Sequence, residues 1–281
     1  MKKEIKRIDF RVRVPYGGYL QFFENEKGGF AKDFCELPYA KSIEQKSMDL
    51  MLQEMEDADI GLAVVPGRGA LGVTNDELFE MSHKYPGKFI IFPYINPLEG
   101  KKALDDIDKY IVCGEGKGAA LEPGFSAGVT YDMDDGRIFP VYQKLQELQI
   151  PVLLTYSSLG LPYMDMDAPK RLDAVARKFP ELVIVVGHAG WPWTREHITI
   201  AFMRKNIYLS PDAYGVRVPG SEDYIKAAKT MLQDKMIFGS SYPIIPIKET
   251  AEFVDQQWGL TEEIKEKIFY KNAARLLKLE D

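Results

Sequence analysis

Short runs of β-branched and aliphatic residues recur along the chain, and a longer amphipathic stretch follows each of them. This alternation is typical of repeated βα units. The apolar runs predict eight strands, at residues 5–13, 60–66, 88–95, 117–122, 151–156, 181–187, 206–210 and 235–239. Helical patterns occupy residues 43–57, 77–85, 99–112, 137–148, 168–179 and 221–232, and a helical tail spans 247–279.

Near-continuous apolar strands of this kind are buried on both faces, which predicts a parallel sheet covered by helices. Eight repeats within 281 residues favour an α/β fold, a single (β/α)8 TIM barrel that spans residues 1–281. A doubly wound open sheet is the alternative. It is less favoured because no glycine-rich phosphate loop follows the first strand.

Two connections are too long for the simple repeat. Residues 15–41 are rich in glycine and aromatic side chains, which predicts a folded cap or lid rather than a plain linker. Residues 157–167 follow the fifth predicted strand. Both connections leave from the C-terminal ends of strands, the edge where barrel enzymes build their active sites.

Composition and charge exclude several classes of protein. The chain is 46% hydrophobic and 28% charged, and no run of about 18 apolar residues is present to span a membrane. The start, MKKEIKRIDF, lacks the apolar segment of a signal peptide, so we expect a cytoplasmic protein. A net charge of −6 without a basic cluster argues against a nucleic-acid partner. Cys35 and Cys113 have neither the number nor the spacing of a disulfide framework or zinc site.

Polar side chains stand at the predicted C-terminal ends of the strands. In the stretch IDFRVRV, residues 8–14, Arg11 and Arg13 lie two positions apart and therefore point to the same strand face. The other members of this ring are Arg68, Glu122, Thr155, Tyr156, Ser157, His188, Asp212, Tyr214, Ser240, Ser241 and Tyr242. Charges are rarely buried unpaired, so the ring is either a self-neutralising network or a site for a charged ligand.

The arginines favour the second alternative, because a guanidinium group binds a carboxylate through two parallel hydrogen bonds. The competing interpretation is that Arg11 and Arg13 only form salt bridges with Glu122, Asp212 or Asp9, which shares their strand face. Of these two interpretations we favour ligand binding, and a small anionic substrate is the expected partner.

A free imidazole titrates near neutral pH, and His188 stands at a strand exit, so we expect it to act as a general acid or base rather than as a core residue. Glu122 and Asp212 are candidates for substrate contact or proton transfer, and the sequence does not decide between them. His83 and His197 are expected on outer helices. Trp191 and Trp193 fit equally well as core residues and as pocket walls.

Six segments resemble the amidohydrolase-related (amidohydrolase 2) family of the amidohydrolase superfamily in order and spacing. They are IDFRVRV, PVLLTY, VIVVGHAGWPW, NIYLS, MIFGSSYP and KIFYKNAARLLKL. The family includes aminocarboxymuconate semialdehyde decarboxylase and 2-pyrone-4,6-dicarboxylate lactonase. The resemblance implies a distorted (β/α)8 barrel over nearly the whole chain, and barrel relatives are often dimers. Whether this chain forms a homo-oligomer stays open.

The chain departs from the metal-binding pattern of that family. The first strand there normally ends D-x-H-x-H, with two metal-binding histidines, and Arg11 and Arg13 stand at those positions. Thr155 replaces a further ligand histidine and Ser241 an aspartate, so that only the histidine of the HxG motif, His188, is retained. Two guanidinium groups repel a divalent ion, so we expect no metal ligands and no cofactor.

The resemblance and the substitutions together imply a metal-independent hydrolase of a small carboxylate-bearing lactone, cyclic amide or ring-derived metabolite. A decarboxylase or hydratase of a small unsaturated carboxylate is the enzymatic alternative, and a non-catalytic anion-binding barrel is the other. The expected catalytic residues are His188, Glu122 and Asp212. The expected substrate-binding residues are Arg11, Arg13, Arg68, Tyr156, Trp191, Tyr214, Ser241 and Tyr242.

Overall fold

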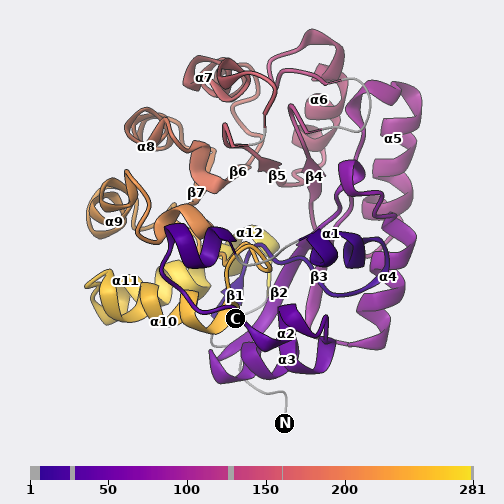
Figure 1. Cartoon of the computed structure of the whole chain (residues 1–281). Coiled ribbons are helices and arrows are strands. Elements are labelled where there is room, and N and C mark those ends of the chain that lie inside the picture. Colours follow the sequence, from indigo (N-terminus) through magenta and orange to yellow (C-terminus); the bar gives the residue numbers. More distant parts are fainter. Residues whose placement is uncertain (1–6, 26–28, 126–129, 160, 280–281) are drawn as a thin grey trace.

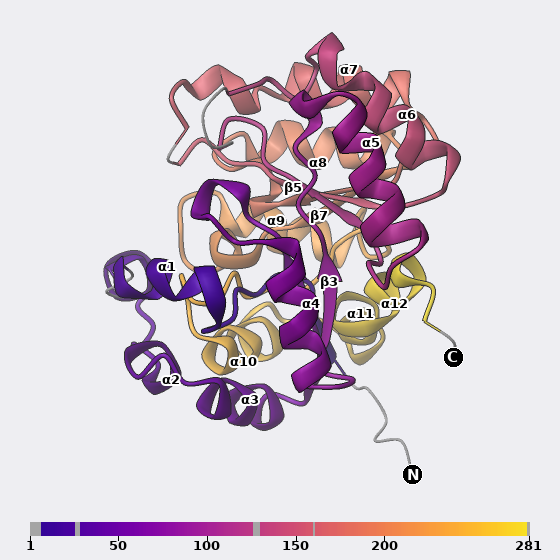
Figure 2. The same ribbon diagram turned by 90° about the vertical axis from the view of Figure 1, so that its right-hand side faces the viewer.

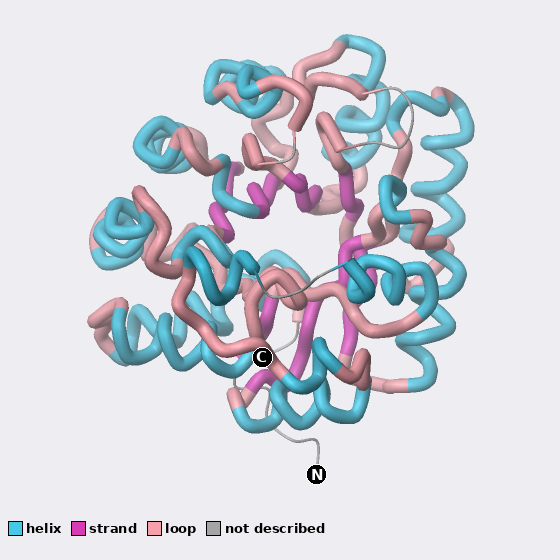
Figure 3. The backbone as a smooth tube through the Cα atoms, viewed as in Figure 1, coloured by secondary structure: helices cyan, strands magenta, loops and turns pink. Residues whose placement is uncertain are grey.

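Parallel strands line the centre of the molecule, and helices surround them (Figure 1). The computed structural model describes residues 7–25, 29–125, 130–159 and 161–279. Within them the strands are β1 (Arg7–Asp9), β2 (Ile60–Pro66), β3 (Phe89–Phe92), β4 (Ala119–Leu121), β5 (Val152–Thr155), β6 (Ile184–Gly187) and β7 (Ile207–Ser210). They pair in chain order, as β1-β2-β3 and as β4-β5-β6-β7, and every pairing is parallel. Figure 3 shows them as a broken ring inside the helices.

Isolated bridges join the two sheets into a barrel. On one side, Tyr94 bridges Ala120 in parallel, so that β3 is followed by β4. On the other side, Leu209 bridges Met236 and Val12 bridges Tyr242. The predicted distorted α/β barrel is therefore confirmed, with residues 236–242 in the place of the eighth strand.

The eighth predicted strand, 235–239, does not form as a strand, and the first ends earlier than predicted. One carboxylate oxygen accounts for part of both differences. Asp9 Oδ1 accepts hydrogen bonds from the backbone N–H of Arg11, at 3.0 Å, and from that of Ser240, at 2.9 Å. These two donors bond a side chain instead of a neighbouring strand, so the regular ladder stops beside them.

Twelve α-helices lie in the described residues, and most follow the predicted ranges. They are α1 (Leu20–Asn25), α2 (Lys41–Glu44), α3 (Met48–Asp57), α4 (Asn75–Lys84), α5 (Lys101–Ile107), α6 (Phe139–Glu147), α7 (Pro169–Lys178), α8 (Thr194–Met203), α9 (Ser221–Lys229), α10 (Ile247–Gln257), α11 (Glu262–Glu266) and α12 (Asn272–Leu277). The predicted helix 43–57 is split at Lys46, whose φ is +49°, and the tail is broken at Gly259, whose φ is +60°. None of the helices described is long and apolar enough to cross a membrane.

The barrel is filled by apolar side chains at the end opposite α1. Ile8, Phe10, Val64 and Val185 form one buried cluster with Leu276 and other residues of α12. Figure 2 shows α12 and α1 at opposite ends of the barrel. The polar residues at the strand ends therefore face α1, and this is the end at which a ligand could reach them.

The segment that was predicted as a cap, 15–41, is largely helical where it is described. A short 3-10 helix, Gly17–Tyr19, leads into α1, and a π-helix follows at Phe30–Phe34. Tyr19 donates its hydroxyl to the Pro66 carbonyl at the end of β2. This contact places Tyr19 at the C-terminal end of β2.

Candidate active site

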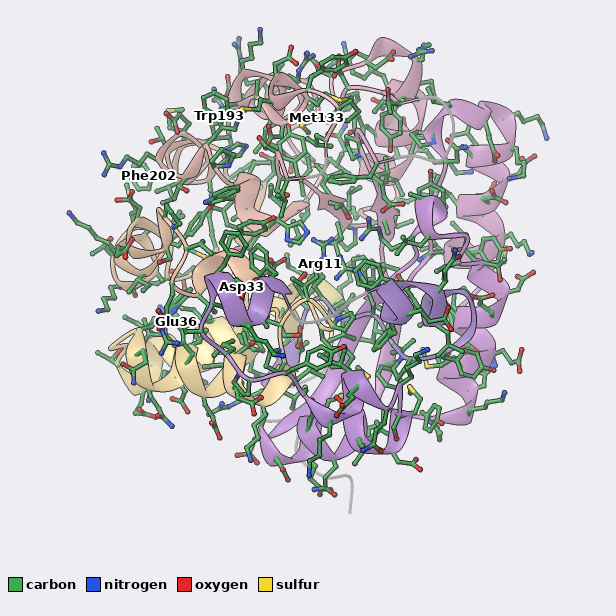
Figure 4. All side chains as sticks on the ribbon, viewed as in Figure 1. Arg11, Asp33, Glu36, Met133, Trp193 and Phe202 are labelled. Atoms are coloured by element: carbon green, nitrogen blue, oxygen red, sulfur yellow. The ribbon has the colours of Figure 1, made fainter. Side chains whose placement is uncertain are left out.

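Arg11 lies at the centre of the barrel, with no exposed surface (Figure 4). Its Nη2 donates to Thr155 Oγ1 at 3.0 Å, and its Nη1 lies 3.6 Å from Asp212 Oδ2. Any side chain at Gly187 would collide with Nη1, so the glycine leaves the space that the guanidinium fills. Nε and Nη1 of Arg11 make no hydrogen bond with the described residues. A buried guanidinium with unused donors suits an anionic ligand.

Arg13 is also buried, at 1% exposure, and points into the same end of the barrel. Its Nη1 donates to the Ser241 carbonyl at 3.1 Å and lies 3.3 Å from Ser241 Oγ. The ring of Phe22, on α1, lies over the guanidinium with 5.3 Å between its centroid and Cζ. Ser241, which was predicted as a substrate-binding residue, therefore also holds Arg13.

Arg68 and Glu122 form a buried ion pair through Arg68 Nε and Glu122 Oε1. The second carboxylate oxygen of Glu122 accepts from the Ala70 backbone at 3.3 Å. Burial, and after it the charges of Arg13 and Arg11, hold the pKa of Arg68 well below its usual value. The structure thus brings Glu122 to Arg68, and this contact neutralises the third arginine.

His188 and Asp212 form the second polar pair of the site. His188 Nδ1 lies 2.8 Å from Asp212 Oδ1, and the His188 backbone N–H donates to Asp212 Oδ2 at 3.1 Å. Because a carboxylate accepts, Nδ1 carries the proton, and Nε2 is the atom available to a substrate. Both residues have left-handed backbones, with φ of +66° for His188 and +44° for Asp212. Such strained conformations cluster at functional sites.

The imidazole of His188 is neutral at pH 7. Burial, and after it the charge of Arg11, lower the pKa of His188 to about 4, against the opposing effect of Asp212. A neutral imidazole with a free Nε2 is able to accept a proton.

Two aromatic rings form a wall beside this pair. The Tyr214 ring meets the His188 ring edge to face, with centroids 5.1 Å apart. Trp191 stacks on the other side of Tyr214 at 5.1 Å and is partly exposed. Trp191 thus packs against the core cluster and at the same time lies beside the ring that contacts His188.

The hydroxyl groups of Tyr156 and Tyr242, both predicted to bind substrate, bond to groups other than the arginines. The Tyr156 hydroxyl lies 3.4 Å from the Met166 carbonyl, and the Tyr242 hydroxyl donates to Ser42 Oγ at 3.0 Å. Alternation explains the placement of Tyr156, because its neighbour Thr155, at the end of β5, contacts Arg11 and so faces inward.

The remaining histidines lie outside the site. His83 is exposed on α4, with Nε2 3.0 Å from Glu115. His197 lies on α8, an outer helix as expected, yet it has no exposed surface, and its Nδ1 lies 2.8 Å from the Trp193 carbonyl. The Trp193 Nε1–H donates to Asp167 at 3.2 Å. His197 and Trp193 therefore pack in the layer outside the barrel strands rather than in the site.

Sequence reasoning did not select three residues that belong to this site. Asp9 joins the backbones of Arg11 and Ser240, and burial raises the pKa of its carboxyl to about 7. Tyr19 is fully buried, and Phe22 covers Arg13. The spacing in IDFRVRV shows Asp9 on the arginine face, whereas the two aromatic residues come from a connection whose path the sequence does not reveal.

The residues present do not fit a divalent metal ion. In the parts of the chain that the structure describes, no group of three or more His, Cys, Asp or Glu side chains is placed to hold one. Asp212 is already engaged by His188 and faces Arg11, whose positive charge opposes a second cation in the same space.

Comparisons with known proteins agree with this fold. The amidohydrolase family model matches residues 8–279. An uncharacterised TIM-barrel protein of Bordetella bronchiseptica is 33% identical, with a TM-score of 0.89 over 97% of this chain and 98% of that one. A comparison with curated proteins gives no significant match.

Two more distant structures share the fold at lower identity. A dihydroxybenzoic acid decarboxylase of Polaromonas, with bound manganese and the inhibitor 2-nitroresorcinol, is 17% identical, with a TM-score of 0.71 over 98% of both chains. A 4-oxalomesaconate hydratase of Rhodopseudomonas palustris is 19% identical, with a TM-score of 0.66 over 97% of this chain and 95% of that one. The family match spans almost the whole sequence, and the chain belongs to the amidohydrolase family.

Proposed function

We propose that this chain is a metal-independent hydrolase of a small carboxylate-bearing lactone, cyclic amide or ring-derived metabolite. One observation carries the proposal: Asp212 contacts both Arg11, at 3.6 Å, and His188, at 2.8 Å. The cation that suits an anionic substrate and the imidazole that suits proton transfer are thereby joined through one carboxylate.

The arginines supply the positive charge of the site. Arg11 has unused buried donors and receives the substrate carboxylate, while Arg13, next to Ser241, faces the oxygen on which negative charge develops. Fixed donors in a site that excludes water stabilise such an oxyanion strongly. Arg68 is already paired with Glu122, so it contributes to the electrostatic potential of the site and does not bind the substrate directly.

His188 acts as the general base. Asp212 holds the imidazole in the tautomer with the proton on Nδ1, so Nε2 accepts the proton of a water that attacks the substrate carbonyl. The same group then donates that proton to the leaving oxygen or nitrogen. No step requires a bound metal, which is consistent with guanidinium groups at the two positions where the family pattern has histidines.

A lyase is the second candidate, because two of the structural neighbours are named as a decarboxylase and a hydratase. In that reaction Arg11 and Arg13 stabilise an enolate, and His188 exchanges a proton with carbon. A barrel that only binds an anionic metabolite is the non-catalytic alternative.

Two further features are proposed with this function. The segment 15–41 serves as the cap of the site, since Tyr19 and Phe22 reach the arginine end of the barrel. The protein works in the cytoplasm on a small molecule, without nucleic acid or membrane, as a monomer or a homo-oligomer.

A substrate panel with one variant tests the proposal. Lactones, cyclic amides and unsaturated carboxylates are assayed with the wild type and His188→Asn, without added metal. We expect the rate of hydrolysis to fall about 10²–10⁴-fold in the variant. Phthalate serves as the dicarboxylate binding probe, and its stabilisation of the protein in thermal-shift assays is expected to persist in the variant. Carbon dioxide release or hydration instead of hydrolysis favours the lyase. Phthalate binding without turnover on any panel member favours the binding protein.

A further inference from the structure

The arginines of the proposed site are closed to solvent in this structure. Arg11 and Arg13 are 0 and 1% exposed, and Arg68 is 7% exposed. The other end of the barrel is filled by the apolar cluster around Phe10 and α12. An anion therefore has to enter at the end where α1 lies (Figure 2).

Two phenylalanine rings cover guanidinium groups at this end. The Phe22 centroid lies 5.3 Å from Arg13 Cζ, and the Phe125 centroid lies 5.9 Å from Arg68 Cζ. Both side chains are only partly buried. A cation–π contact at a partly exposed position is weak compared with a charge-assisted hydrogen bond to a carboxylate. A carboxylate that reaches Arg13 can therefore displace the Phe22 ring at low cost, and the Phe125 ring loses only one weak contact when it turns away from Arg68.

The backbone that carries Phe22 is held more firmly than its ring. Gly18 donates its N–H to Glu77 at 2.6 Å, and Tyr19 bonds the Pro66 carbonyl. The next ring along α1, Phe23, is buried against Tyr242 at 5.6 Å. Movement of α1 as a whole breaks all of these contacts, whereas rotation of the Phe22 side chain breaks none of them.

Resting on the anion site of the proposed function, we propose that Phe22 and Phe125 form its entrance and select anions by size. Because α1 is anchored, the two rings rather than the backbone set the width of this passage. Small anions pass beside the rotated rings, while bulky ones are slowed by the ring volume that remains in the passage. Phe22 and Phe125 are thus specificity-determining residues that no sequence motif identifies.

Association kinetics with two probes test this proposal. Oxalate is the small probe and benzene-1,3,5-tricarboxylate the bulky one, followed by stopped-flow tryptophan fluorescence, since Trp191 lies at the site. In Phe22→Ala and in Phe125→Ala, we expect the association rate constant of the tricarboxylate to rise about tenfold or more, with oxalate nearly unchanged. Phe22→Leu, which keeps apolar volume and preserves folding, is expected to give a smaller rise.

Phe34→Ala is the matched control. Phe34 lies in the same segment but is 60% exposed and stacks on Phe30 rather than on an arginine, so we expect no change for either probe. Tricarboxylate rates equal to wild type in the Phe22 and Phe125 variants overturn the entrance, even when oxalate binding depends on Arg11. Absence of binding of both probes to the wild type overturns the proposed anion site itself, and the entrance with it.

Discussion

Asp212 accepts two hydrogen bonds from His188, one from the imidazole Nδ1 at 2.8 Å and one from the backbone N–H at 3.1 Å. This contact fixes both the tautomer and the position of the ring. In Asp212→Asn the side-chain amide either donates to Nδ1 or leaves its proton without an anion, so the reactive tautomer is disfavoured. We expect kcat to fall about 10²–10⁴-fold with little change in KM, measured with the substrate that the panel identifies. A loss confined to KM would assign Asp212 to binding instead.

The buried pair of Arg68 and Glu122 is expected to control stability. Glu122→Gln leaves a buried guanidinium without its counter-charge, which costs ~3–5 kcal/mol in free energy of unfolding. The double variant Arg68→Met with Glu122→Gln removes both charges and should recover most of this loss. Urea unfolding of the three proteins measures the effect.

An exposed ion pair provides the control for that measurement. Lys101 and Asp105 are 2.8 Å apart on α5 and largely exposed. We expect Asp105→Asn to change the free energy of unfolding by ~0.5 kcal/mol or less. A Glu122→Gln effect no larger than this one would show that the buried pair is dispensable.

Asp9 gives the stability a distinctive pH dependence. Burial raises the pKa of its carboxyl from the usual 3.8 to about 7 in the folded chain. Between these values the folded chain holds a proton that the unfolded chain has released, so this contribution to stability is lost as pH rises from about 4 to 7. In Asp9→Asn that loss is absent, and we expect its stability relative to wild type to rise across this interval. A constant difference from pH 4 to 7 would contradict the raised pKa.

His197 gives the stability of the folded chain the opposite pH dependence. Burial lowers its pKa to about 4, against 6.5 in the unfolded chain. The unfolded chain therefore takes up a proton first as pH falls, and stability is lost from about pH 6.5 down to 4. His197→Gln should weaken this acid sensitivity in urea unfolding and leave turnover intact, because the residue lies behind the barrel. A large loss of turnover would place His197 in the reaction.

Much of the barrel follows from the sequence because its signals are local. Seven of the eight predicted strands form, since apolar runs such as Ile60–Pro66 are recognisable in the sequence by themselves and are buried on both faces in the barrel. The last predicted strand, 235–239, fails because the Phe238 amide donates to the Ile268 carbonyl, and the Ser240 amide just beyond it donates to the side chain of Asp9, more than two hundred residues earlier. A contact of that range leaves no local pattern.

The site was predictable to a similar extent. Strand ends and alternation placed Arg11, Arg13, His188 and Asp212 together, and the structure brings them to one place. The same alternation, applied one residue further, assigns Tyr156 to the outer face, where its hydroxyl contacts the Met166 carbonyl. The pairing of Arg68 with Glu122 and the cover of Phe22 depend on how loops fold back over the barrel, which periodicity does not encode.

We propose that two arginines occupy the place of a metal ion, and elemental analysis is the most direct test of this proposal. The protein is purified without added metal, and zinc, manganese and iron are measured per chain by mass spectrometry, alongside oxalate binding by titration calorimetry. We expect metal well below one equivalent per chain, with oxalate binding that survives EDTA and is lost in Arg11→Met. A stoichiometric metal that is retained on dialysis and lost in His188→Asn would contradict it.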